Sequence, residues 1–325
     1  AVHAISGGAP VRLDGLGGAS VTSVALDASG TRAVFRAETS LQHFQLFSVP
    51  LDGSTPPIDL LPGSGASLDA DYRLAGNRAF FGESLGGWFA NLYSAVLDGS
   101  APTVALGFSD MPIQAFLPGA DGERVVLHTS SAPYTAPELF TVASDGSTPR
   151  PLNERLDVGG VVLDFQLSGD GARVAYLAHQ GHGRPELYSV PLTRSTRPRR
   201  ISAFTPTPPR GLVSAFTATP DGERVLYFAR ESEASRGQLF SVPADGPERA
   251  RPVHPLLSGE ILDWQIAGGS QRVVFRANSS ANGPALLLSS PVDGRGETRM
   301  LHPASTGPID RHQVLADGAT VVFAS

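Results

Sequence analysis

The chain has 325 residues, a formal net charge of −6 and no cysteine, which excludes disulfides, thiolate metal sites and a cysteine nucleophile. Lysine is also absent, so all 25 basic residues are arginine, and no basic block indicates a nucleic-acid partner. Gly (36) and Pro (27) are abundant, as in an all-β protein with many turns.

The sequence predicts no membrane span, because no apolar run reaches the roughly 18 residues that cross a bilayer. The chain begins AVHAISGGAP, which lacks a charged segment followed by an apolar one. We therefore expect no signal peptide in this chain.

One phrase recurs along the chain, and each copy opens at a leucine. The copies are LFSVPLDGSTP at 46, LYSAVLDGSAP at 92, LFTVASDGSTP at 139, LYSVPLTRSTRP at 187, LFSVPADGP at 239 and LLSSPVDG at 287. A second phrase, such as ADGERVVLHTS (120–130) or PDGERVLYFAR (220–230), precedes each copy. The period of about 40 to 50 residues is typical of four-stranded propeller blades.

Within each unit the pattern predicts four strands, with Asp-Gly turns joining the first to the second and the third to the fourth. Second strands such as RVAYL and RVLYF are apolar at successive positions, which indicates burial on both faces. The predicted blades are 20–62, 68–106, 112–153, 161–202, 212–254 and 260–302.

The last segment, 310–325, supplies only two strands of a seventh unit, and residues 1–13 resemble the missing two. We therefore predict one domain, 1–325: a seven-bladed β-propeller of four-stranded antiparallel blades. The N- and C-terminal strands would close the ring in one shared blade, which removes an exposed sheet edge.

PDGERVLYFAR followed by GQLFSVPADG resembles the WD40-like (PD40) repeat of the TolB propeller family, and is similar to the propeller domains of prolyl-oligopeptidase-type enzymes. The resemblance covers nearly the whole chain, although the first turns read ASG, AGN and GGS in units one, two and six. It implies a periplasmic or extracellular protein. The chain has no G-x-S-x-G nucleophile elbow, so it cannot itself be such a peptidase.

Binding residues are expected on the varied loops opposite the Asp-Gly turns, because variable loops on a rigid scaffold commonly carry binding. An exposed Trp88–Phe89 pair and Tyr134 are candidate aromatic anchors, although these side chains could equally pack the loops onto the blades. His179 and His182 form HQGH, a spacing that can chelate a metal but lacks further ligands. His312 aligns with Phe165, Phe216 and Trp264, and is expected in the core.

The innermost strands share an apolar-Asp-aromatic-polar-apolar pattern, and alternation would turn their polar side chains toward a central channel. These side chains are Asp71, Arg73, Asp164, Gln166, Asp263, Gln265, Arg311 and Gln313. Asp71, Asp164 and Asp263 would repel one another there, so Arg73 and Arg311 or a structural Ca²⁺ are candidate counter-charges. Each Asp could instead bond a neighbouring backbone group.

The sequence favours a non-catalytic, monomeric binding module that presents its loop face and channel to a protein, peptide or glycan, with no cofactor required. Two alternatives remain: a metal-assisted lyase or hydrolase acting at the channel mouth, and a scaffold domain of a larger secreted protein.

Overall fold

The structure is a computed structural model, and it describes residues 12–13, 15–63, 67–85, 88–107, 112–129, 138–179, 184–202, 212–230, 236–246, 249–255, 257–302, 309–315 and 317–324. These residues form 26 strands and a single 3₁₀ turn, Gly268–Ser270, and therefore an all-β fold. The chain divides into two compact units, Ala1–Leu152 and Asn153–Ser325.

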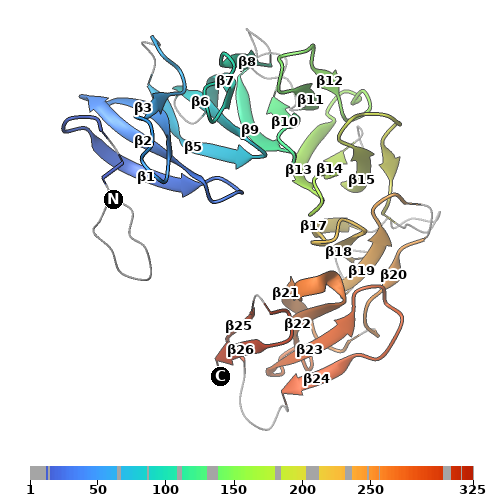
Figure 1. The fold of residues 1–325 in the computed structure, drawn as a ribbon. Helices are drawn as coiled ribbons and strands as arrows, with labels where there is room; N and C mark the ends of the chain where they lie inside the picture. The colour runs from blue at the N-terminus through green and yellow to red at the C-terminus, as the bar shows by residue number, and fades with distance from the viewer. Residues whose placement is uncertain are drawn as a thin grey trace. The chain divides into compact units, whose positions relative to one another are not determined.

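The first unit contains a four-stranded antiparallel sheet and an eight-stranded one (Figure 1). The first sheet comprises β1 (Ser20–Leu26), β2 (Arg32–Ser40), β3 (His43–Pro50) and β4 (Ile58–Asp59). The second comprises β5 (Leu68–Ala75), β6 (Arg78–Leu85), β7 (Trp88–Val96), β8 (Val104–Leu106), β9 (Ile113–Pro118), β10 (Arg124–Thr129), β11 (Glu138–Ala143) and β12 (Arg150–Pro151). A single bridge, Phe89 to Ile113, joins its halves, so it is effectively two four-stranded sheets.

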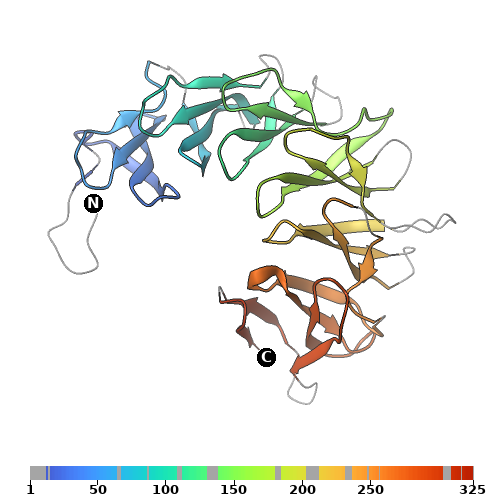
Figure 2. The same ribbon diagram turned by 45° about the vertical axis from the view of Figure 1, so that its right-hand side comes forward.

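The second unit contains three four-stranded antiparallel sheets followed by a two-stranded one (Figure 2). Their strands are β13 (Val161–Leu167), β14 (Arg173–His179), β15 (Glu186–Pro191), β16 (Arg199–Arg200), β17 (Leu212–Ala218), β18 (Arg224–Arg230), β19 (Gln238–Pro243), β20 (Arg251–Pro252), β21 (Ile261–Ile266), β22 (Arg272–Asn278), β23 (Ala285–Pro291), β24 (Arg299–His302), β25 (Arg311–Val314) and β26 (Val321–Ala324).

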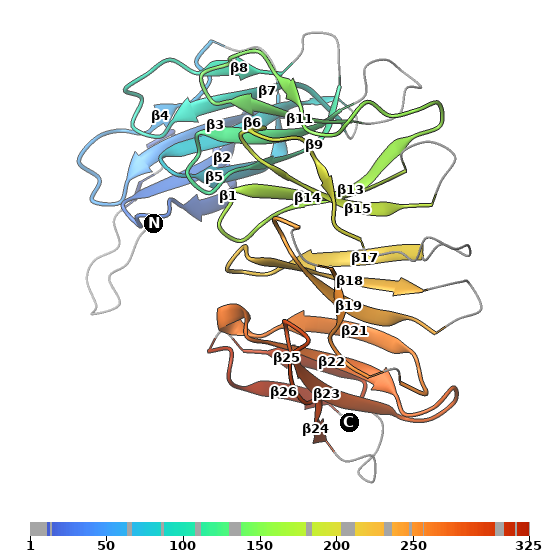
Figure 3. The same ribbon diagram turned by 90° about the vertical axis from the view of Figure 1, so that its right-hand side faces the viewer.

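Successive sheets within a unit pack face to face, with an apolar layer between each pair. Figure 3 shows the sheets of the second unit stacked in chain order. Tyr227 of β18 packs in the layer toward β13–β16, whereas Leu226 of the same strand packs toward β21–β24. The second strands are thus buried on both faces, as the uninterrupted apolar runs predict.

The Asp-Gly turns lie between first and second strands, as predicted. Asp121 accepts a hydrogen bond from the Glu123 N–H, and Gly122 has φ of +74°. Gly122 also packs against the turn of the preceding sheet, where an added Cβ would overlap the Ala75 carbonyl. Glycine is therefore required there both for its backbone conformation and for the contact between sheets.

An arginine begins each of six second strands and donates to a hydroxyl on the neighbouring third strand. The pairs are Arg32–Ser48, Arg78–Ser94, Arg124–Thr141, Arg173–Ser189, Arg224–Ser241 and Arg272–Ser289, at 2.8 to 3.1 Å. This bond explains why two residues recur in each repeat: the Arg after the turn, and the Ser or Thr in motifs such as LFSV.

The ring closure predicted from residues 1–13 depends largely on residues 1–11, which lie outside the described part. Arg311–Val314 and Val321–Ala324 form the two-stranded sheet β25–β26, as the incomplete seventh repeat predicts.

Candidate functional site

The first strands of the second unit carry a β-bulge at the same place in three successive sheets. The pairing with the second strand skips one residue each time: Leu163 in β13, Ser214 in β17 and Leu262 in β21. The two leucines are exposed, at 46% and 47%. Because a bulge leaves its extra residue unpaired and redirects its side chain, the bulges present these residues to solvent.

Asp164 follows the first of these bulges and is exposed. Its Oδ1 accepts a hydrogen bond from the N–H of Phe165 at 2.8 Å. This is the local backbone bond that sequence reasoning left open as an alternative to a role in the channel.

Two glutamines of the predicted polar set join one sheet to the next. Gln166 donates to the Phe216 carbonyl at 3.0 Å and accepts from the Ala218 N–H at 3.3 Å. Gln265 makes the same pair of bonds to the His312 carbonyl, at 3.0 Å, and to the Val314 N–H, at 2.7 Å. We call each arrangement a glutamine clamp. Each clamp satisfies backbone groups on the free edge of a first strand, which would otherwise be open to pairing with another chain.

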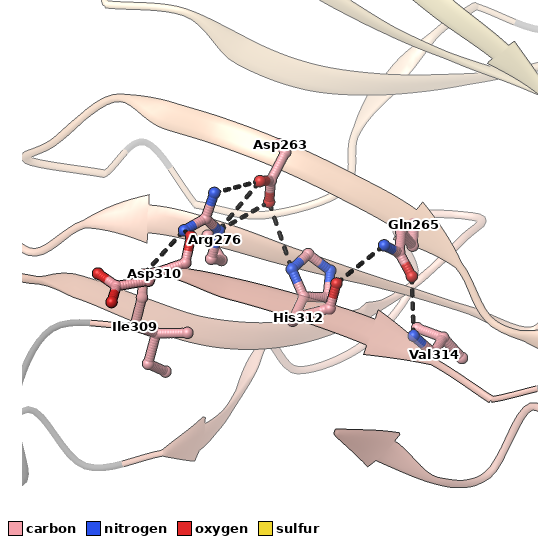
Figure 4. Close-up of polar contacts among 7 residues, drawn as sticks. All are labelled: Asp263, Gln265, Arg276, Ile309, Asp310, His312 and Val314. Carbon is pink, nitrogen blue, oxygen red and sulfur yellow. Dashed lines mark hydrogen bonds and ion pairs between the residues drawn. The ribbon is translucent and has the colours of Figure 1, made fainter. Parts of the chain in front are cut away.

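Asp263 and His312 meet Arg276 in a polar cluster beside the second clamp (Figure 4). Arg276, on β22, forms a bidentate ion pair with Asp263 and donates to the Ile309 carbonyl at 2.8 Å. The His312 ring, with its side chain 1% exposed, places Nδ1 3.3 Å from Asp263 Oδ1. Asp263 remains 42% exposed, so the cluster is partly open to solvent.

The charges of this cluster act on both Arg276 and His312. The hydrogen bond that Arg276 donates to the Asp263 carboxylate raises the pKa of Arg276 above its ordinary value. Burial lowers the pKa of His312, against an opposing effect of the Asp263 charge. His312 is therefore a buried residue, as the alignment with Phe165 predicts, but it lies against an ion pair.

In the first unit, Asp71 and Arg73 form an exposed ion pair along β5, with Nε and Oδ1 3.3 Å apart. Arg73 is thus a counter-charge for the aspartate two residues before it on the same strand. For Asp263 that partner is Arg276, whereas Arg311 and Gln313 are exposed on β25.

Arg276 does not belong to the predicted set, although the sequence carries a signal for it. VFRA occurs twice, at 34–37 and 274–277. Arg36, in the first copy, donates to the Leu68 carbonyl at 3.0 Å, and Arg276 reaches the corresponding carbonyl of Ile309. Both arginines extend from a second strand to the start of the next sheet.

The predicted loop residues are only partly within the described chain. Trp88 opens β7, and His179 ends β14, at the opposite end of that strand from the Asp170–Gly171 turn. The prediction that Phe89 is exposed is wrong, because Phe89 is buried in the apolar layer between β5–β8 and β9–β12. Tyr134 and His182 lie outside the described residues. Within the described chain, no three His, Asp or Glu side chains gather closely enough to hold a metal ion.

No protein-family model and no curated protein matches the chain. Among solved structures, a prolyl endopeptidase, from a study of inter-domain dynamics in catalysis and specificity, matches 96% of the chain with a TM-score of 0.54 and 14% identity. The match covers 47% of that protein, so the chain spans about half its length. A TolB structure from Agrobacterium tumefaciens matches 76% of this chain and 84% of its own, with 17% identity and a TM-score of 0.40.

No helix in the described ranges is long and apolar enough to cross a membrane. At 14% identity the endopeptidase match is informative about the fold alone. Together with the stacked four-stranded antiparallel sheets, it gives this chain a propeller-like all-β fold.

Proposed function

We propose that the chain is a non-catalytic binding module that presents the bulged first strands and their adjoining loops to a protein, peptide or glycan partner. The observation that carries the proposal is the pair of exposed leucines, Leu163 and Leu262, at equivalent bulges. Their neighbours Asp164 and Asp263 place carboxylates beside apolar side chains, a mixture suited to a specific contact surface.

Rigidity of the first strands supports this assignment. The glutamine clamps at Gln166 and Gln265, and the Arg276–Asp263 ion pair, fasten the strands that carry the exposed residues. A surface that is already ordered loses less conformational entropy when it binds a partner.

The test is a selection from a random peptide library and a glycan array, using the immobilised full chain. We expect ligands whose affinity falls at least tenfold in the double variant Leu163→Ser/Leu262→Ser. The matched control, Met300→Ser/Leu301→Ser, changes two exposed apolar residues of the outer strand β24 and should bind normally. Equal binding to both variants would place the partner elsewhere and refute the proposed surface.

The proposed architecture is a seven-bladed ring in which residues 1–13 complete the blade begun by 310–325. The two-stranded sheet β25–β26 supports it, because Val322 and Phe323 remain exposed there. Deleting residues 1–13 should then lower the melting temperature markedly or cause aggregation. A deletion variant that melts like the intact chain would exclude this closure.

A second candidate is a scaffold domain of a larger protein, periplasmic or extracellular in keeping with the TolB-like repeat. The coverage of only 47% of the endopeptidase chain favours this alternative. The complete open reading frame around the segment would decide it, because a partnered domain would be encoded beside the propeller.

A further inference from the structure

A half-open cavity of about 340 Å³ lies at the turn end of the β9–β12 sheet in the first unit. Its lining comprises Arg124, Ala143, Ser147, Thr148 and Arg150. The volume is at the lower end of the range for small-molecule sites. Two guanidinium groups and two hydroxyl-bearing residues thus surround a space suited to a small ligand.

Strand register explains why the two arginines share this cavity. Arg150 pairs directly with Thr141 across β11 and β12, and opposed residues lie on one face of a sheet. Arg124 donates its Nε to the Thr141 hydroxyl at 3.0 Å. The two arginines therefore flank one threonine. Burial lowers the pKa of Arg124, and the nearby charge of Arg150 lowers it further.

The same cross-strand pattern recurs in the second unit, which makes the arginine pair a feature of the repeat. The equivalent triples are Arg173–Ser189–Arg199, Arg224–Ser241–Arg251 and Arg272–Ser289–Arg299. What distinguishes β9–β12 is the residue opposite the first arginine. In β9–β12 this residue is Ala143. In four other sheets the equivalent residue is a proline, namely Pro50, Pro191, Pro243 or Pro291, and in one it is Val96.

Alanine in place of a larger side chain leaves the space between the arginines unfilled. The adjoining turn also borders the cavity. Gly146 has φ of +80°, and the Asp145 carboxylate accepts hydrogen bonds from the N–H and hydroxyl of Ser147. The turn is therefore held by its own bonds and defines one wall of the cavity through Ser147 and Thr148.

The charges around the cavity decide which ligand fits. The Nε of Arg124 is committed to Thr141, which leaves its terminal nitrogens to face a ligand beside Arg150. A guanidinium binds carboxylate and phosphate oxygens through parallel hydrogen bonds. The negative charge of the Asp145 carboxylate opposes this attraction, and hydrogen bonds from Ser147 lower the pKa of Asp145 from an ordinary value that is already well below neutral pH. A dianion gains more from the arginine pair than a monoanion does.

We propose that this cavity is a binding site for a small dianion, a phosphate monoester or a dicarboxylate, held between Arg124 and Arg150. The site shares no residue with the bulged strands, so it does not depend on the partner proposed above. Ala143 provides the room, and Thr148 in the same wall carries a hydroxyl that can donate to a ligand oxygen, whereas the Ser147 hydroxyl already donates to Asp145.

The test is a titration of the full chain with phosphate, succinate and chloride at constant ionic strength, followed by the NMR signal of the Arg124 Nε–H and by calorimetry. Phosphate or succinate should saturate at one equivalent, whereas chloride should not. Arg150→Gln should weaken binding at least tenfold. Ala143→Val and Ala143→Pro should do the same, because each introduces a residue that fills the equivalent space in another sheet.

Two further variants keep the outcome decisive. Asp145→Asn should strengthen binding several-fold by removing an opposing charge. Arg251→Gln, in the equivalent pair of the β17–β20 sheet, should leave binding unchanged. The proposal is overturned if the response to phosphate and succinate is non-saturable and equals that to chloride. It is also overturned if folded Arg150→Gln and Ala143→Val proteins bind as well as the original.

Discussion

Replacing Gln265 by Ala tests whether the glutamine clamp fastens one sheet to the next. The side chain makes two hydrogen bonds, to the His312 carbonyl and the Val314 N–H. A net contribution of about 0.5–1.5 kcal/mol per bond gives a local loss of about 1–3 kcal/mol. Because about 1.4 kcal/mol is a tenfold change in an equilibrium constant, the Val314 amide should exchange roughly 5- to 140-fold faster.

The assay is amide hydrogen exchange, because it reports the opening of one strand without requiring the whole chain to unfold in one step. Gln271→Ala is the matched control, since Gln271 is an exposed glutamine that bonds the Gly269 carbonyl within its own turn. Thr217 occupies the clamp position in β17. Thr217→Gln should add a clamp to the β21 edge and slow exchange at Ile266.

The reasoning is refuted if Val314 exchange is unchanged in Gln265→Ala, or if Gln271→Ala accelerates it equally. Faster exchange spread evenly over the second unit would also contradict it, because the clamp would then act on global stability and not on the β25 edge.

Three other changes test the packing and the buried polar groups. Burial lowers the pKa of His254, whose neutral ring accepts from the Leu239 N–H at 3.1 Å. The unfolded chain therefore takes up the proton first, and denaturant titrations should show stability complete above about pH 6.5 and falling below it. His254→Gln should flatten this dependence, and an unaltered pH profile would contradict the assignment. A double-mutant cycle of Arg224→Met and Ser241→Ala should give a coupling of about 1 kcal/mol, and additivity would show that the 2.8 Å bond contributes nothing. Gly169→Ala should destabilise by about 1–3 kcal/mol in thermal unfolding, because its Cβ would overlap the backbone of the next turn, and an unchanged melting temperature would show that the turns can separate.

The sheets and turns were predictable because they depend on short local motifs, the Asp-Gly pairs and the apolar runs, that recur in each repeat. An Asp-Gly pair such as Asp121–Gly122 determines its own turn, and apolar runs such as RVAYL report burial directly. The bulges at Leu163 and Leu262 carry no such signal, because a skipped residue is visible only in the pairing between strands. Simple alternation therefore could not predict which side chains become exposed.

The polar site was only partly predictable, because its side chains bond partners that lie on other strands. Gln166 and Gln265 belong to the predicted set, but they bond backbone atoms, and no sequence pattern identifies a backbone acceptor. Asp263 has its counter-charge in Arg276, on the neighbouring strand, whereas reasoning along the first strands considered only Arg73 and Arg311. The two VFRA copies, compared with each other, are the sequence signal that points to Arg276.

The glutamine clamp also bears on how such a chain can grow by duplication. The donor blade supplies the side chain, and the recipient supplies only a carbonyl and an N–H. Phe216 and His312 differ in chemistry, yet their strands receive the same two bonds. A duplicated blade would thus retain the glutamine that bonds it to the next blade. The next blade would need no compensating substitution, because it contributes only backbone groups.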